Sequence, residues 1–230
     1  GFGFKTIRVH PKKKFKQISF EGSFTLNKKE VNPYNFQPEE DFYNSYQTIQ
    51  TLGFKVDFEI FLRKTHLTTL PEKQFDLYNF DKNIPLFENL LALNNWTSNN
   101  INFKPDVTTV HTTLEEIIEV RHGVCQDFAH LFCALARHNG VPARYVSGYL
   151  DQGYGYLGDS QMHAWGVAFI PQIGWVGFDP TNNLLANTDH IKVAHGKDYK
   201  DCSPLRGVIY SQGGHKTSHT VRVQGQQQQQ

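Results

Sequence analysis

Cysteine is scarce in this sequence of 230 residues, which contains only Cys125, Cys133 and Cys202. A fold held by disulfides needs more cysteines in a shorter chain, so that class of protein is excluded. Three thinly spread cysteines fit a reducing compartment, and we expect a cytoplasmic protein. The sequence begins with Gly1 rather than Met, so we expect it to have been trimmed from a longer chain.

Long apolar runs and strong charge imbalance are also missing. No stretch approaches the ~20 apolar residues that a membrane helix needs, and no signal peptide is visible. The formal net charge is +1. The run Lys12-Lys13-Lys14 fits a solvated turn or a protected sheet edge better than a phosphate site. We therefore expect neither a membrane nor a nucleic-acid partner.

Patterns of metal ligands are also absent around Cys125. His122 and His130 flank Cys125, but no Cys-x-x-Cys or His-x-x-x-His pair accompanies them. No acidic loop has the spacing of calcium ligands. We expect no metal and no cofactor.

Apolar and aromatic residues are plentiful. Hydrophobic residues make up 39% of the sequence and include eighteen Phe, so a substantial core can form. Before residue 80, several segments alternate apolar and polar residues as half-buried strands do, and we expect an antiparallel β unit there. The alternating segments are 5–9, 17–24, 46–52 and 54–61.

A change of hydrophobic period near residues 70–84 predicts a domain boundary. We divide the chain into an N-terminal β region (1–82), a catalytic core (83–223) and a disordered Gln-rich tail (224–230). The core is predicted to be α+β, with helices packed on an antiparallel sheet. Helices are expected at 85–96, at 112–120 with a capping box from Thr112 to Glu115, and from Val124 to Asn139. A polar loop is expected at 94–102, and strands at 143–150, 163–170, 174–179 and in a last pair within 207–223.

Cys125 is predicted to open the third helix, where free N–H groups and the helix dipole lower the pKa of a thiol. A nucleophilic cysteine also needs a base and a group that orients the base. His163 opens one strand and Asp179 ends the next, at the same end of an antiparallel pair, so their side chains can meet. A single such cysteine is usually a small buried residue. The three residues together indicate catalysis, whereas Cys133 fits the core and Cys202 has no assigned role.

Several neighbouring residues have structural interpretations that we prefer to functional ones. Asp127 is expected to cap the helix start, and Trp165, on the same face as His163, to pack in the core. The loop 151–161 fits a substrate wall or lid and a plain connector equally well. Arg144 and Arg206 are candidates for binding a substrate carboxylate, although ordinary salt bridges are the favoured interpretation.

Four blocks of the sequence closely resemble bacterial transglutaminase-like proteins, which are often described as candidate cysteine proteases. These blocks are 123–130, 140–149, 163–165 and 179–182. The segment 195–207 is similar to the family's Gly-Arg-Asp-Tyr segment, with Lys197 where arginine is usual. The resemblance is strong over 83–223 and looser before it. It implies a papain-like transglutaminase core, with Cys125 as nucleophile, His163 as general base and Asp179 as orienting acid.

The reaction that the resemblance implies is acyl transfer at an amide or peptide bond through a thioester on Cys125. Water as the acceptor makes the protein a protease or amidase, and an amine makes it a transglutaminase. We favour hydrolysis, because the sequence shows neither a calcium-site pattern nor large accessory domains. The remaining alternative is a non-catalytic module that binds a peptide or partner. The substrate, the second oxyanion donor and the oligomeric state are not determined by the sequence.

Overall fold

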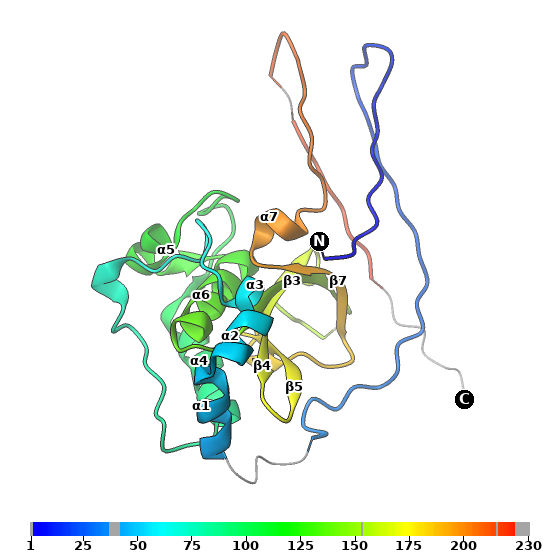
Figure 1. Cartoon of the computed structure of the whole chain (residues 1–230). Coiled ribbons are helices and arrows are strands. Elements are labelled where there is room, and N and C mark those ends of the chain that lie inside the picture. The colour runs from blue at the N-terminus through cyan, green and yellow to red at the C-terminus, as the bar shows by residue number, and fades with distance from the viewer. Residues whose placement is uncertain (1, 37–41, 153, 215, 224–230) are drawn as a thin grey trace.

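The structure is a computed structural model that describes residues 2–36, 42–152, 154–214 and 216–223. Its core has helices packed against a five-stranded sheet, and two long extended arms leave this core (Figure 1). This arrangement confirms the predicted α+β class. Among the described residues, no helix is long and apolar enough to cross a membrane.

The central sheet is antiparallel, with the strand order β6-β5-β4-β3-β7. The predicted strands at 143–150, 163–170 and 174–179 are confirmed at both ends. The edge strand β7 was not predicted. The strands are β3 (Ala143–Leu150), β4 (His163–Ile170), β5 (Gly174–Asp179), β6 (Leu184–Leu185) and β7 (His190–Gly196).

The central helix α6 (Cys125–His138) packs on one face of this sheet, and its predicted bounds are confirmed. Its Phe132 ring stacks on Phe178 of β5 with centroids 5.2 Å apart. Ala164 and Ala168 of β4 are buried in the same core, so alternate residues of β4 face the helix. The intervening residues, which include His163 and Trp165, therefore point to the opposite face.

The helices around α6 start or end slightly away from their predicted bounds. The predicted loop at 94–102 is wrong, because α4 (Leu86–Asn100) continues through it and buries Thr97. The capping box of α5 (Leu114–Val120) is shifted by one residue and joins Thr113 to Glu116. The remaining short elements are β1 (Asn102–Phe103), β2 (His122–Gly123), the 3-10 helix η1 (Glu72–Gln74) and α7 (Tyr199–Cys202).

The predicted strands at 46–52 and 54–61 are wrong, because these segments are helical. They form α1 (Phe42–Gln50), α2 (Leu52–Asp57) and α3 (Glu59–Leu62). Phe54, Phe58 and Phe61 are spaced by four and then three residues, so they lie on one face of a helical segment and pack toward Phe169 and Trp175. The same side chains also fit the alternating pattern of a strand. Their contacts with the sheet favour the helical conformation.

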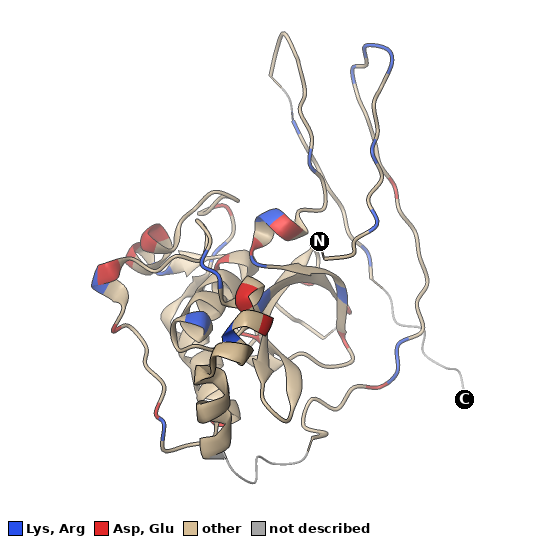
Figure 2. Cartoon of the chain, viewed as in Figure 1, with Lys and Arg blue, Asp and Glu red and all other residues tan. Residues whose placement is uncertain are grey.

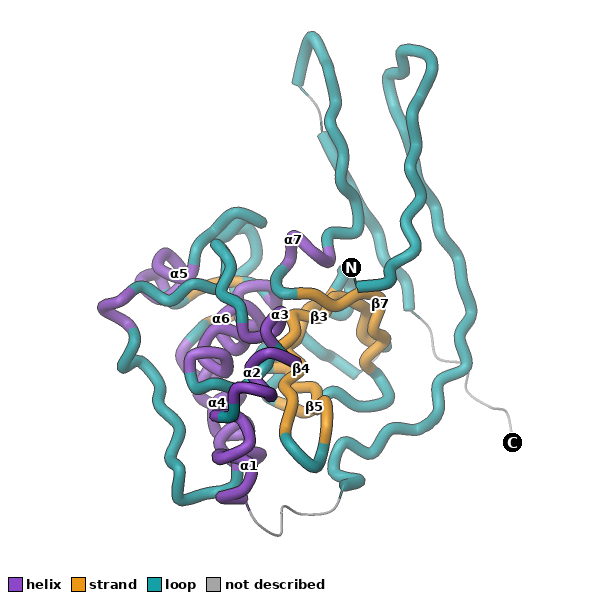
Figure 3. Tube along the Cα trace, in the orientation of Figure 1, coloured by secondary structure: helices purple, strands orange, loops and turns teal. Residues whose placement is uncertain are grey.

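The arms are residues 2–36, the N-terminal arm, and 203–223, the C-terminal arm. Both run as extended loops (Figure 3), and their described residues contain none of the predicted strands. Many of their apolar side chains are exposed, including Ile7 at 92% and Tyr210 at 96%. Lys12, Lys13 and Lys14 are exposed at a bend of the N-terminal arm, in agreement with a solvated turn. Lys and Arg positions are coloured blue in Figure 2. The predicted tail 224–230 lies outside the described residues.

Candidate active site

Cys125 is the first residue of α6, and its side chain is half-buried. The fully buried Asp127 holds this end of the helix, as the sequence predicted. Its Oδ2 accepts the backbone N–H of Val124 at 2.8 Å and the hydroxyl of Thr108 at 2.6 Å. The Sγ atom of Cys125 lies 3.8 Å from the carbonyl oxygen of Met162, immediately before β4. The start of α6 is thereby fixed against the start of β4.

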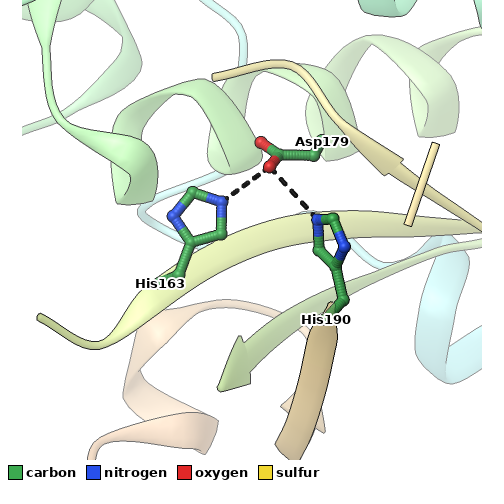
Figure 4. A group of neighbouring side chains, drawn as sticks. All are labelled: His163, Asp179 and His190. Atoms are coloured by element: carbon green, nitrogen blue, oxygen red, sulfur yellow. Dashed lines mark hydrogen bonds and ion pairs between the residues drawn. The ribbon is translucent and has the colours of Figure 1, made fainter. Parts of the chain in front are cut away.

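His163 and Asp179 meet across β4 and β5, and both side chains are buried (Figure 4). The Nε2 atom of His163 lies 2.8 Å from Oδ2 of Asp179. The backbone N–H groups of Thr181 and Asn182 donate to Oδ1 at 3.0 and 3.3 Å, and the Asn182 amide donates to Oδ2 at 2.8 Å. These donors keep the carboxylate in place and orient the imidazole.

The charges of His163 and Asp179 stabilise each other. Burial alone would lower the pKa of His163, but the Asp179 carboxylate outweighs burial, and with the neighbouring Cys125 thiol it raises the pKa to about 10. Burial alone would raise the pKa of Asp179, but His163 and His190 hold it well below its usual range. The remaining ring nitrogen of His163, Nδ1, is buried and has no hydrogen-bond partner among the described residues. It is therefore available to the thiol or to a substrate.

His190 is a site residue that the sequence reasoning missed. It is the first residue of β7, and its Nε2 lies 3.2 Å from the same Oδ2 of Asp179 that bonds His163 (Figure 4). Its Nδ1 lies 3.2 Å from the backbone nitrogen of Asn187 and 3.1 Å from that residue's Oδ1. Nothing in the local sequence marks His190, because its approach to Asp179 depends on the pairing of β3 with β7.

The loop that carries His190 is held by the N-terminal arm. Nζ of Lys28 donates to the carbonyl oxygens of Asn187, Thr188 and His190 at 2.7, 2.8 and 2.5 Å. The backbone N–H of Val31 donates to Oγ1 of Thr188 at 2.8 Å. The arm therefore contributes to the support of the Asp179 network, a role that its sequence did not suggest.

Trp165 shields the buried pair from the side of the sheet. Its ring stacks near His163 with centroids 6.0 Å apart and meets His190 edge-on at 5.1 Å. A Cβ at Gly148, on the neighbouring strand, would lie 2.8 Å from the Trp165 ring. Glycine at that position lets the indole cross β3, so the expected packing role of Trp165 is confirmed and extends to both histidines.

The loop 151–161 passes directly over His163. A Cβ at Gly158 would lie 2.8 Å from Nδ1 of His163, and the φ angle of Gly158 is +86°. This loop therefore forms a wall of the site at the Nδ1 nitrogen of His163. Of the two interpretations of the loop, the structure favours the wall over the plain connector.

His163, Asp179 and His190 are also the one group in the described part of the chain whose ligand atoms are close enough to hold a metal ion, all lying within 4.8 Å of one another. In the structure both Nε2 atoms point at one carboxylate oxygen, which is the geometry of N–H donors to an acceptor. The arrangement is accounted for by hydrogen bonds, and it fits proton chemistry.

The other cysteines lie in environments that suppress thiolate formation. Burial raises the pKa of Cys133 to about 11, in agreement with its predicted place in the core. Cys202 ends α7, where burial and nearby acidic residues raise its pKa to about 12. Arg144 and Arg206 take part in none of the ion pairs among the described residues, so the predicted salt bridges are wrong.

Comparison with known proteins places this site within a recognised domain. Residues 79–180 match the model of the transglutaminase-like superfamily. A protein of Mycobacterium tuberculosis without an assigned activity is 41% identical over 136 residues, which is 55% of this chain and 43% of that protein. The protein-glutamine gamma-glutamyltransferase of Pseudomonas aeruginosa is 33% identical over 84 residues, which is 34% of this chain and 13% of that protein.

Among solved structures, the chain is similar to a candidate cysteine protease from Cytophaga hutchinsonii. The two chains superpose with a TM-score of 0.59 and 30% sequence identity, covering 71% of this chain and 55% of that one. The chain thus spans about half the length of the Mycobacterium tuberculosis protein and of the Cytophaga hutchinsonii chain. These likenesses confirm the predicted core fold.

Proposed function

Because residues 79–180 form a transglutaminase-like core domain, we propose that this protein is a cysteine-dependent acyl-transfer enzyme acting on amide or peptide bonds. The observation that carries the proposal is the buried 2.8 Å contact between Nε2 of His163 and Oδ2 of Asp179, next to Cys125 at the start of α6. Cys125 is the proposed nucleophile, His163 the proton carrier and Asp179 the orienting acid.

In the first step, the Cys125 thiolate attacks the carbonyl carbon of the substrate and forms a C–S bond. The backbone N–H of Cys125 is one of the helix N–H groups without an intrahelical acceptor, so it can donate to the developing oxyanion. The His163 imidazolium gives its Nδ1 proton to the leaving nitrogen as the C–N bond breaks. The products are a thioester on Cys125 and a free amine.

In the second step, an acceptor attacks the thioester while His163 takes its proton. The acyl carbon bonds to the acceptor, the C–S bond breaks, and the Cys125 thiolate is restored beside the His163 imidazolium. We propose water as the acceptor, which makes the protein an amidase or protease. The likeness to the candidate cysteine protease of Cytophaga hutchinsonii supports this choice, and the likeness to the gamma-glutamyltransferase supports amine transfer as the alternative. The proposed location is the cytoplasm.

Acylation of Cys125 tests the proposed chemistry without knowledge of the substrate. We expect p-nitrophenyl acetate, followed by acid quenching and peptide mapping, to give an acetyl thioester on Cys125 but none on Cys133. The Cys125→Ala variant should release nitrophenol no faster than buffer. An acetyl group distributed equally over the cysteines would exclude a dedicated nucleophile and favour the non-catalytic module.

The acceptor is identified by a competition between water and an amine. Casein is incubated with the wild-type protein and dansylcadaverine, with Cys125→Ala as the control. New peptide N-termini that are absent from the control would support hydrolysis. Covalent dansyl fluorescence on intact casein would instead establish the transglutaminase alternative.

A further inference from the structure

A cavity of about 230 Å³ lies on the face of the sheet that points away from α6. Strands β3, β4, β5 and β7 line it, and Lys28 and Val31 of the N-terminal arm close it. Trp165 and Val167 project into it from β4, on the side opposite to the residues that pack on the helix. Cys125 and His163 are not among its lining residues, so this cavity is distinct from the proposed nucleophile's site.

Basic side chains line the cavity, and within the described residues His190 is the one of them that is paired with an acid, Asp179. Lys28, Arg144, Lys192, His190 and His195 line it, and its described lining residues include neither Asp nor Glu. Within the described ranges, no ion pair involves Lys28, Arg144 or Lys192. A concave site with several cations and no carboxylate has a field that attracts anions.

Arg144 is the central cation of this cavity. Its Nε is buried and has no hydrogen-bond partner among the described residues, which is a costly state for a charged donor. Burial lowers the pKa of Arg144, and burial together with the charges of Arg144 and Lys192 lowers the pKa of His195. A bound anion beside Arg144 and Lys192 would relieve the repulsion among these groups.

Two tryptophan rings, Trp165 and Trp175, form part of the cavity wall, and aromatic rings hold the guanidinium of Arg144 in place. The guanidinium carbon of Arg144 lies 3.5 Å from the ring centre of Trp175 and 4.4 Å from that of Phe61. Trp165 forms part of the wall and separates the cavity from His163. Flat apolar walls next to a fixed planar donor suit a ligand with an apolar or aromatic body and a planar or tetrahedral anionic group.

We propose that this cavity binds a small molecule that carries a carboxylate or phosphate group on an apolar or aromatic body. The anionic group lies at Arg144 and Lys192, and the body lies against Trp165 and Trp175. The volume is below the ~300 Å³ at which drug-sized pockets begin, so a ligand of about one ring fits. The cavity shares Trp165 and His190 with the surroundings of Asp179, but ligand binding there does not require the acyl-transfer reaction.

Isothermal titration calorimetry with three matched probes tests the proposal on the full chain. Benzoate and phenyl phosphate carry the two anionic groups, and benzamide has the same ring without charge. We expect at least one anion to bind saturably, with quenching of tryptophan fluorescence, and benzamide to bind at least about tenfold more weakly, since loss of one charge-assisted contact costs that much. The stronger of the two anions identifies the preferred group.

Substitutions of cavity residues test where the anion binds. Arg144→Gln should weaken anion binding about tenfold or more, and Lys192→Gln provides a second test if the first variant melts early. Lys55→Gln, an exposed lysine on α2 that bonds only Gln50 in the structure, is the control and should bind as the wild type does. Equal affinity for benzamide, no saturable binding of either anion, or unchanged binding in both cavity variants would overturn the proposal.

Discussion

The Asp179 carboxylate connects the residues of the site. Two backbone N–H groups, the Asn182 amide and two histidine rings surround it, with His163 at 2.8 Å and His190 at 3.2 Å. Such a carboxylate stays ionised, and an ionised Asp179 keeps a proton on His163 at neutral pH. The imidazolium that the proposed mechanism needs to protonate the leaving amine is therefore present before substrate binds.

The Asp179→Asn variant tests this role through the pH profile. The Asp179 charge raises the pKa of His163 to about 10, so the wild-type rate should fall on the alkaline side near that pH. In the variant, burial lowers the pKa of His163 unopposed. The alkaline limb of kcat/KM against pH should therefore move to lower pH, and the maximal rate should fall by roughly 10²–10⁴-fold.

An alkaline limb that does not move would contradict this role of Asp179. The pH dependence of the variant's stability provides a control. The proton on His163 contributes fully below the ordinary pKa of about 6.5 and ceases to contribute as pH rises through about 10. The ionised Asp179 contributes fully above its ordinary pKa and loses this contribution as pH falls toward its lowered value. Between the lowered pKa of Asp179 and about pH 10, Asp179→Asn should be less stable than the wild type, and at no pH should it be more stable.

Gly158 gives a second test at the scale of one residue. In Gly158→Ala, the new Cβ would lie 2.8 Å from Nδ1 of His163, so we expect kcat/KM to fall by about tenfold or more as the ring is displaced. Gly155→Ala is a matched control, because Gly155 also has a positive φ of +74° but a Cβ there meets nothing within 4 Å. Equal activity of the two variants would show that the wall over His163 has no catalytic importance.

Three of the site residues were predictable because each stands at an end of an element with a clear sequence signature. Cys125 opens an amphipathic helix, and His163 and Asp179 mark strands that a short turn joins. His190 and Lys28 were not predictable in this way. They reach the site through the pairing of β7 with β3 and through an arm whose contacts span about 160 positions, and neither is encoded locally.

At the scale of the element, the start of α6 is held by a buried charge. Burial raises the pKa of Asp127, and hydrogen bonds from Thr108 and Val124 oppose the rise. Because its folded-state pKa lies above the ordinary value, protonation of Asp127 favours the folded state. The acceptor oxygen at the helix start is therefore the important feature, more than the negative charge.

Asp127→Ala should lower the free energy of unfolding by about 1–3 kcal/mol, since it leaves the Val124 N–H without an acceptor, whereas Asp127→Asn keeps an acceptor and should cost less. Chemical denaturation measures both. Thr113→Ala removes the cap of α5 as a control. Thr113→Ala should lower stability but leave the rate of Cys125 alkylation unchanged. Asp127→Ala should lower both. A larger loss of stability in Asp127→Asn than in Asp127→Ala would contradict this account.

The elements of the core were predictable where the hydrophobic period and the length of a segment indicated the same type of element. Strands β3, β4 and β5 combine alternation with clear turns, and their predicted bounds are confirmed. The arms show the limit of such reasoning. Segments 5–9 and 17–24 alternate as strands do, but alternation selects a strand only where a neighbouring strand and an apolar face are available. Within the described residues, these segments have no such neighbour.

At the scale of the whole molecule, charge separates the arms from the core. The N-terminal arm has eight Lys and Arg against two Asp and Glu, and the C-terminal arm has three against none. Residues 37–202 have twelve against twenty. The positions of Lys and Arg along the arms are coloured blue in Figure 2. The near-neutral total therefore conceals basic arms attached to an acidic core.

This arrangement predicts the course of limited proteolysis. Trypsin should cut first in the arms, after Lys12, Lys13, Lys14 or Arg206, because these residues are exposed and lie in extended loops. The buried Arg137 should be cut last. A mass-spectrometric time course would show trimmed arms on an intact core. Early cleavage inside α6 would contradict the separation of arms from core.

The most direct test of the central claim is the rate of iodoacetamide labelling at each cysteine, measured by peptide mapping in the wild type and in His163→Ala. We predict that Cys125 is labelled at least about tenfold faster than Cys133 and Cys202, whose thiols are buried with raised pKa values. We also predict that His163→Ala slows Cys125 alone. Equal rates at the three cysteines, or a Cys125 rate unchanged in the variant, would contradict the proposed nucleophile and base.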